Sequence, residues 1–204
     1  MAVTPRNPLV LTLTLDKSTQ NFLTTLRSKY FPSHRNFLQA HVTLFHAIPP
    51  QRFPEVDEEL ARLCASTNPW EVFVNDPRKM GNRGVMVSVR DRRQSIEWIH
   101  RRILNFLKDG VKEPKDELTE QDKRHWGKTA HVTILNKAEK EEEVQLCLDE
   151  VTELFEGMKG PDDKFGQKVG SAIGLQIWEY KGGPWDPIKQ YHFKDAQEKD
   201  AEAP

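Results

Sequence analysis

The tetrapeptide Ala-His-Val-Thr occurs twice in this chain, at residues 40–43 and again at residues 130–133. Each copy places a histidine two residues before a threonine, which gives the pairs His41 and Thr43, and His131 and Thr133. An imidazole titrates near neutral pH, so it can take up or release a proton, and a hydroxyl can donate a hydrogen bond to a charged oxygen. Two such pairs in one cleft suit metal-free phosphodiester chemistry. One histidine would activate water, the other would protonate the departing alkoxide, and the threonines would hold the phosphoryl oxygens.

The repetition is too specific to be accidental. Seven histidines and twelve threonines in 204 residues give about 0.4 expected His-x-Thr matches by chance, so a single match would carry no information. Here both matches share the flanking alanine and valine and an apolar fourth residue. We therefore treat His41, Thr43, His131 and Thr133 as one candidate site.

Each copy of the tetrapeptide lies in a segment with the pattern of a β-strand. Alternate side chains of a strand point to the same face, so His41 and Thr43 share one face while Val42 and Leu44 face the core. The second copy repeats this arrangement. Around each copy the apolar patterns predict the order β-α-β-α-β, over residues 8–76 and again over residues 84–193.

This internal repeat predicts an α+β fold with two lobes related by a pseudo-twofold axis. The antiparallel sheets of the two lobes are expected to face a central cleft, and strands are able to exchange between them. We expect residues 1–193 to form a single bilobal domain, followed by a disordered tail over residues 194–204 that is rich in charged residues and alanine.

With its two complete motifs, residues 41–44 (HVTL) and 131–134 (HVTI), the chain resembles the two-histidine phosphoesterase superfamily, which includes RNA-ligase-like proteins and cyclic nucleotide phosphodiesterases. The resemblance implies that His41 and His131 are catalytic and that Thr43 and Thr133 bind phosphate. It also implies metal-independent hydrolysis of 2′,3′-cyclic nucleotides, or of related ribose cyclic phosphates such as ADP-ribose cyclic phosphate, to a 2′-phosphomonoester. It does not assign the acid and the base between the two histidines.

Two other functions remain open at this point. One is an enzyme of RNA ends, either a 2′,5′ ligase or phosphodiesterase or a 3′ exonuclease. The other is a module that binds a nucleotide or RNA without turnover. The formal charge of −1 favours a small substrate, because proteins that bind long nucleic acids are usually basic.

Three aromatic residues are candidates for stacking on a nucleobase, namely Trp126, Phe31 and Trp178. His100 lies in a predicted helix beside Arg101 and Arg102, and we expect it at the surface. No pair of histidines on one helix face joins a nearby carboxylate, so neither a metal nor another cofactor is predicted.

The composition indicates an intracellular protein. Cys64 and Cys147 lie in apolar helical patterns and are expected to be buried free thiols, as in a reducing compartment. No apolar run approaches the ~20 residues that span a bilayer, and the N-terminal segment has the alternation of a strand rather than the core of a signal peptide. We expect a cytoplasmic or nuclear monomer with no membrane partner.

Overall fold

The computed structural model describes residues 5–123, 130–160 and 166–196 of the chain. The strands are β1 (Leu9–Leu15), β2 (Val42–Ile48), β3 (Trp70–Lys79), β4 (Val85–Arg90), β5 (His131–Leu135), β6 (Lys168–Tyr180) and β7 (Trp185–His192). The α-helices are α1 (Lys17–Tyr30), α2 (Phe53–Ala65), α3 (Ser95–Asp109), α4 (Glu120–Lys123) and α5 (Glu141–Glu156). The fold is α+β, as predicted.

These seven strands form one antiparallel sheet in the order β1-β2-β5-β4-β3-β6-β7, and β1 also pairs with β6. The additional pairing closes six of the strands into a ring, with β7 attached to β6. Strand β6 closes the ring because it is long: it pairs with β1 along Ala172–Glu179 and with β3 along Lys168–Ala172. The two sequence repeats therefore exchange elements, since β6 of the second repeat lies between β1 and β3 of the first.

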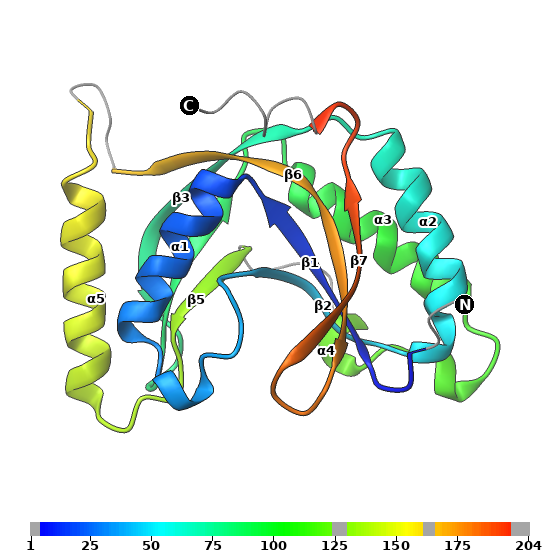
Figure 1. Cartoon of the computed structure of the whole chain (residues 1–204), viewed down its shortest axis with the longest axis horizontal. Coiled ribbons are helices and arrows are strands. Elements are labelled where there is room, and N and C mark those ends of the chain that lie inside the picture. Colours follow the sequence, from blue (N-terminus) through cyan, green and yellow to red (C-terminus); the bar gives the residue numbers. More distant parts are fainter. Residues whose placement is uncertain (1–4, 124–129, 161–165, 197–204) are drawn as a thin grey trace.

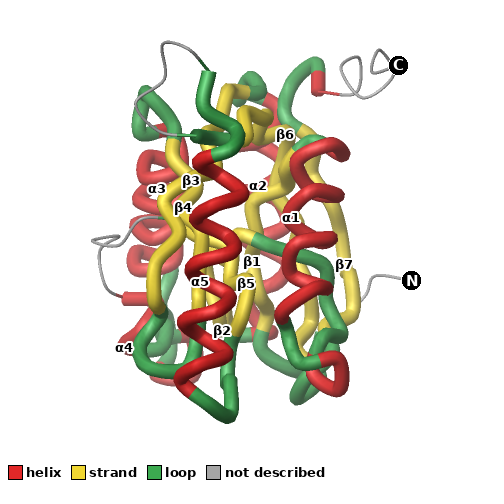
Figure 2. The backbone as a smooth tube through the Cα atoms, turned by 90° about the vertical axis from the view of Figure 1, so that its left-hand side faces the viewer, coloured by secondary structure: helices red, strands yellow, loops and turns green. Residues whose placement is uncertain are grey.

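The helices cover the sheet in two pairs. In Figure 1, α1 and α5 lie on one side of the strands and α2 and α3 on the other. The view from the side in Figure 2 shows α1 and α5 next to each other in front of the strands. Phe22 of α1 and Phe155 of α5 join this pair in an edge-to-face contact with ring centroids 6.0 Å apart. Helix α1 also packs against β5, although it follows β1 in the chain.

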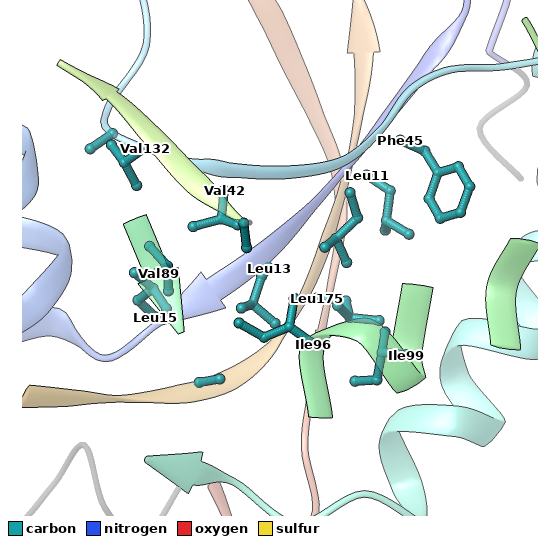
Figure 3. Packing of buried hydrophobic residues seen from close by; sticks show 14 of the residues in the cluster. Leu11, Leu13, Leu15, Val42, Phe45, Val89, Ile96, Ile99, Val132 and Leu175 are labelled. Atoms are coloured by element: carbon teal, nitrogen blue, oxygen red, sulfur yellow. The ribbon is translucent and has the colours of Figure 1, made fainter. Parts of the chain in front are cut away.

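The core lies on the apolar face of the strands, where the leucines of β1 alternate with its threonines. In Figure 3, Leu11 and Leu13 of β1 lie near Ile96 and Ile99 of α3, with Val42 of β2 in the same cluster. All five are at most 4% exposed. Truncating one such leucine to alanine typically costs about 2–5 kcal/mol. Because burial of these side chains is worth so much, it determines which face of each strand packs on the core and which face points away from it.

The start of α1 is tied to the neighbouring strand by Asp16, which caps the helix. Its carboxylate accepts hydrogen bonds from the backbone N–H of Thr19 at 3.0 Å and from that of Ser171 in β6 at 2.6 Å. Gly170 permits this close approach, because a Cβ there would lie 2.0 Å from the Thr19 hydroxyl oxygen. The helix that follows β1 is thereby held against β6.

Several details differ from the sequence-based expectations. His100 is not at the surface but only 4% exposed, and its ring stacks on Phe45 with the centroids 4.6 Å apart. Its position four residues after Ile96 places it on the apolar stripe of α3. The last strand of the first repeat, β3, continues to Lys79, beyond the expected end of that repeat at residue 76. At the other end of the chain, Ala196 is only 1% exposed, so the ordered chain extends beyond the expected start of the tail.

Among the described residues, no helix is both long enough and apolar enough to cross a membrane.

Candidate functional site

The two motif strands β2 and β5 are neighbours, and they pair about their central valines. Val42 lies opposite Val132 in an antiparallel register. One residue out on either side, this register places His41 opposite Thr133 and Thr43 opposite His131. Because alternate side chains share a face, the two histidines and the two threonines all lie on the face opposite the core valines. All four are partly exposed, whereas Val42 and Val132 are fully buried.

This face carries a row of polar side chains on both sides of the motifs. Thr12 of β1 pairs with Thr43, and Gln176 of β6 pairs with Thr12. On the other side Ser88 of β4 pairs with His131. Directly opposite residues in antiparallel strands have Cβ atoms about 4.5–5.5 Å apart, so His131 lies between two hydroxyl-bearing residues.

The environment of His41 favours its neutral form. Its Nδ1 lies 2.8 Å from the carbonyl oxygen of Gln39, which can only accept, so Nδ1 carries the proton and Nε2 presents a lone pair. The pKa of His41 is lowered from 6.5 to about 4, chiefly by burial; the Gln39 hydrogen bond opposes this shift, and the nearby charges of Arg27, His46 and His131 add to it. At neutral pH this imidazole is a proton acceptor.

A cavity of about 510 Å³ opens beside His41. Its lining includes Thr12 and Gln176 of the polar row and two tryptophans, Trp178 of β6 and Trp185 of β7. The Trp185 ring lies on the His41 imidazole, with centroids 4.6 Å apart and planes inclined by 48°. Trp178 donates a hydrogen bond from its indole N–H to the Thr12 hydroxyl at 2.9 Å. The cavity therefore has an aromatic wall next to one of the two histidines.

The three aromatic residues proposed from the sequence have different positions. Trp178 lines the cavity. Phe31 is not part of that lining; its ring lies instead against the guanidinium of Arg27, whose Cζ is 3.6 Å from the ring centroid. Trp126 lies outside the described residues.

Two residues next to the motifs were missed by the sequence reasoning. Trp185 reaches His41 only because β7 pairs with β6, and its local sequence carries no sign of this contact. Arg27 of α1 donates a hydrogen bond from Nη1 to the carbonyl oxygen of Thr133 at 2.7 Å. It had a detectable signal, because it follows Leu23 by four residues and so interrupts the apolar stripe of its helix.

Within the described ranges, no cluster of three or more histidine, cysteine, aspartate or glutamate side chains has a geometry that could hold a metal ion. Cys64 and Cys147 are buried and unpaired, and burial raises the pKa of each thiol to about 12.

Comparison with known proteins gives this geometry a context. The family model described as the 2′-5′ RNA ligase superfamily matches residues 15–183, which is most of the chain. The chain belongs to the 2′-5′ RNA ligase superfamily. Membership in this superfamily indicates ligase or phosphoesterase chemistry. No significant match was found among proteins with curated descriptions.

Solved structures show the fold of the superfamily in distant sequences. TT0787 of Thermus thermophilus superposes with a TM-score of 0.61 at 12% identity, covering 92% of this chain and 98% of TT0787. A protein described as a phosphoesterase has a TM-score of 0.58 at 11% identity, covering 94% and 99% of the two chains. E. coli LigT complexed with 3′-AMP has a TM-score of 0.55 at 11% identity, covering 93% and 99%. At these identities the likeness extends to the fold alone.

Proposed function

We propose that this protein is a metal-independent phosphodiesterase that opens 2′,3′-cyclic ribose phosphates, and that its product is a 2′-phosphomonoester. The observation that carries the proposal is the register of β2 and β5, in which each histidine of the repeated motif lies opposite the threonine of the other copy. Such a set offers an acid, a base and two hydroxyl donors to a single phosphate. If a 5′-hydroxyl of a second strand attacked phosphorus in place of water while the same bond to the 3′ oxygen broke, the product would be a 2′,5′ linkage, in keeping with the superfamily name.

In the proposed reaction His41 acts as the base and His131 as the acid. The Nε2 atom of neutral His41 takes a proton from water as the water oxygen attacks phosphorus. The bond between phosphorus and the ribose 3′ oxygen breaks, and that oxygen receives a proton from His131. The 2′ oxygen keeps the phosphate. One proton enters the histidine pair and one leaves it, so exchange with solvent restores the starting state.

Thr43 and Thr133 are proposed to donate hydrogen bonds to the non-bridging phosphoryl oxygens. Their hydroxyls flank the histidines on the same face, where charge accumulates on those oxygens in the transition state. Among the described residues, the Thr133 hydroxyl makes only a weak contact, 4.0 Å from the Met80 sulfur, which leaves it able to donate to a phosphoryl oxygen.

The cavity is proposed to take the nucleobase and ribose of the substrate. Its volume of about 510 Å³ is within the range of ~300–1,000 Å³ typical of small-molecule sites. Of the described residues that line it, His41 is the only titratable one. An uncharged wall with Trp178 and Trp185 suits an aromatic base better than a chain of phosphates. The LigT structure complexed with 3′-AMP is in keeping with a mononucleotide ligand for this fold.

Buried, unpaired Cys64 and Cys147 suit a reducing compartment, so we propose that the protein acts in the cytoplasm or nucleus. We also propose that it acts as a monomer, because one chain supplies both motif strands and the wall of the cavity. Sedimentation at micromolar concentration tests the monomer directly.

The superfamily itself supports a second candidate, an enzyme that acts on 2′,5′ linkages at RNA ends. The test is to incubate the protein, with EDTA present, with each 2′,3′-cyclic nucleoside monophosphate and separately with a 2′,5′-linked dinucleotide. Products are separated by chromatography against 2′- and 3′-phosphate standards. Opening of the cyclic phosphates to the 2′-phosphate supports the leading proposal, and cleavage of the dinucleotide alone supports the second. Saturable binding without turnover of either substrate would indicate a binding module.

A further inference from the structure

Arg27, on the apolar face of α1 in its last turn, is a buried cation beside the motif strands. Its side chain is only 5% exposed. Nε donates to the side-chain oxygen of Asn36 at 3.0 Å, Nη1 donates to the backbone oxygen of Thr133 at 2.7 Å, and the guanidinium lies over the ring of Phe31. All three partners are neutral.

A buried guanidinium normally has a carboxylate partner, because an uncompensated charge in the interior costs several kcal/mol. Among the described residues, no aspartate or glutamate lies within ion-pair distance of Arg27. Burial lowers the pKa of Arg27 to about 10, which still leaves it charged at neutral pH. A positive charge is thus held in the fold at a place where packing alone would favour leucine or methionine.

The contacts of Arg27 join the two copies of the motif. Asn36 and Phe31 belong to the segment that leads from α1 to His41, and Thr133 belongs to the second copy. The ladder between β2 and β5 is short and pairs Val42 with Val132. Beside that pair, Arg27 takes the Thr133 carbonyl oxygen as acceptor. It therefore bonds to one motif strand and to the segment that carries the other histidine.

The charges around His41 come from three elements. Arg27 of α1, His46 of β2 and His131 of β5 all act on it electrostatically. Arg27 is the permanent charge in this group, because the other two are imidazoles. The remaining residues of the cavity wall beside His41 carry no charge.

We propose that Arg27 is a positioning residue of the site: it fixes the Thr133 strand relative to the segment that carries His41, and its fixed charge opposes protonation of His41. This inference rests on the proposed function for its effect on the rate, but its electrostatic part can be tested without turnover.

The electrostatic part is tested by following the His41 ring with NMR between pH 3 and 8, without substrate, in four forms of the full chain. These are the wild type, Arg27→Met, Arg27→Lys and, as a matched control, Lys29→Met. Lys29 is on the same helix but exposed, paired with Glu150 at 2.7 Å. We expect the His41 midpoint to rise in Arg27→Met and to stay in place in Arg27→Lys and Lys29→Met. An unchanged midpoint in Arg27→Met would overturn the proposal.

The positioning part is tested by kcat/KM on the cyclic phosphate that the wild type opens. Arg27→Lys keeps the charge but lacks the forked guanidinium that reaches both Asn36 and Thr133. We therefore expect kcat/KM to fall about 10- to 100-fold, while the acidic limb of its pH profile stays unchanged. Asn36→Ala removes one of the two hydrogen-bond acceptors of Arg27, so we expect a smaller fall in kcat/KM. If either variant is less stable but keeps the wild-type kcat/KM, Arg27 stabilises the fold without positioning the site, and the positioning part of the proposal is wrong. If the wild type opens no cyclic phosphate, the proposed function fails, while the NMR midpoints still decide the electrostatic inference.

Discussion

Replacing Trp185 by alanine should change how activity depends on pH. The Trp185 ring covers the His41 imidazole at 4.6 Å, and burial is the largest cause of the low His41 pKa of about 4. Removing the indole admits water to the imidazole, which moves its pKa toward the ordinary value of 6.5. A base must be neutral to accept a proton, so the acidic limb of kcat/KM follows this pKa.

The size of the effect follows from the two limiting pKa values. At pH 5, a histidine with a pKa of about 4 is roughly 90% neutral, whereas one with a pKa of about 6.5 is roughly 3% neutral. The ratio of mutant to wild-type kcat/KM should therefore be lower at pH 5 than at pH 8, where both forms are almost fully neutral. The upper limit of this difference is about 30-fold, because the charges around His41 also contribute to the shift. Any loss of base stacking lowers the ratio equally at both pH values.

The assay is kcat/KM for a 2′,3′-cyclic nucleotide from pH 4 to pH 8. Trp185→Phe keeps an aromatic cover on His41 and should preserve most of the wild-type profile. Trp98→Ala is the matched control, because Trp98 lies on α3, is 47% exposed and does not line the cavity. If Trp185→Ala and the wild type have the same acidic limb, the indole does not set the charge state of His41, and the reasoning is refuted.

Three further predictions concern other parts of the molecule. Thr43→Val and Thr133→Val should each lower kcat by about 10- to 1,000-fold with little change in the folding transition, because each removes one donor to the phosphoryl oxygens; a wild-type kcat in both would exclude that role. The pKa of the Asp122 carboxyl is lowered overall: burial by itself raises it, but hydrogen bonds from His46 and from the backbone N–H of Ala47 lower it by more. This carboxylate therefore stabilises the fold at pH values above its ordinary pKa, and the contribution is lost as the pH falls. Asp122→Asn should thus cost about 1–3 kcal/mol in urea unfolding at pH 7 and much less at pH 3, and an equal cost at both pH values would contradict this. Ser88→Ala should be neutral or slightly stabilising in the same assay, since the Ser88 hydroxyl is buried without a hydrogen-bond partner among the described residues; a loss above about 1 kcal/mol would show that it has one.

The central part of the site could be predicted from the sequence because its signals are local. Strand periodicity placed His41 and Thr43 on one face, and the repetition implied that His131 and Thr133 would do the same. The expectation of two sheets facing a cleft left open whether the two motif strands pair, and in the structure they are neighbours in one sheet. Their register, with Val42 opposite Val132, required the structure, since a shift of two residues would keep every side chain on its face.

The remaining parts depend on contacts between residues far apart in the chain. Trp185 meets His41 only after β7 pairs with β6, and β6 meets β1 across more than 150 residues. No pattern within either segment encodes those partners. His100 was misplaced for another reason: its two arginine neighbours outweighed its place on the apolar stripe of α3 in the interpretation. Arg27 on the stripe of α1 is the same kind of signal, a polar residue where the period demands an apolar one.

The most direct test of the account is hydrolysis of 2′,3′-cyclic nucleotides in EDTA by the wild type, His41→Ala, His131→Ala and His192→Ala. His192 is exposed at the end of β7 and controls for the loss of any histidine. The account predicts opening to the 2′-phosphate by the wild type and His192→Ala, and a loss of at least about 100-fold in each of the other two. Folded His41→Ala or His131→Ala with wild-type activity would contradict the paired acid and base.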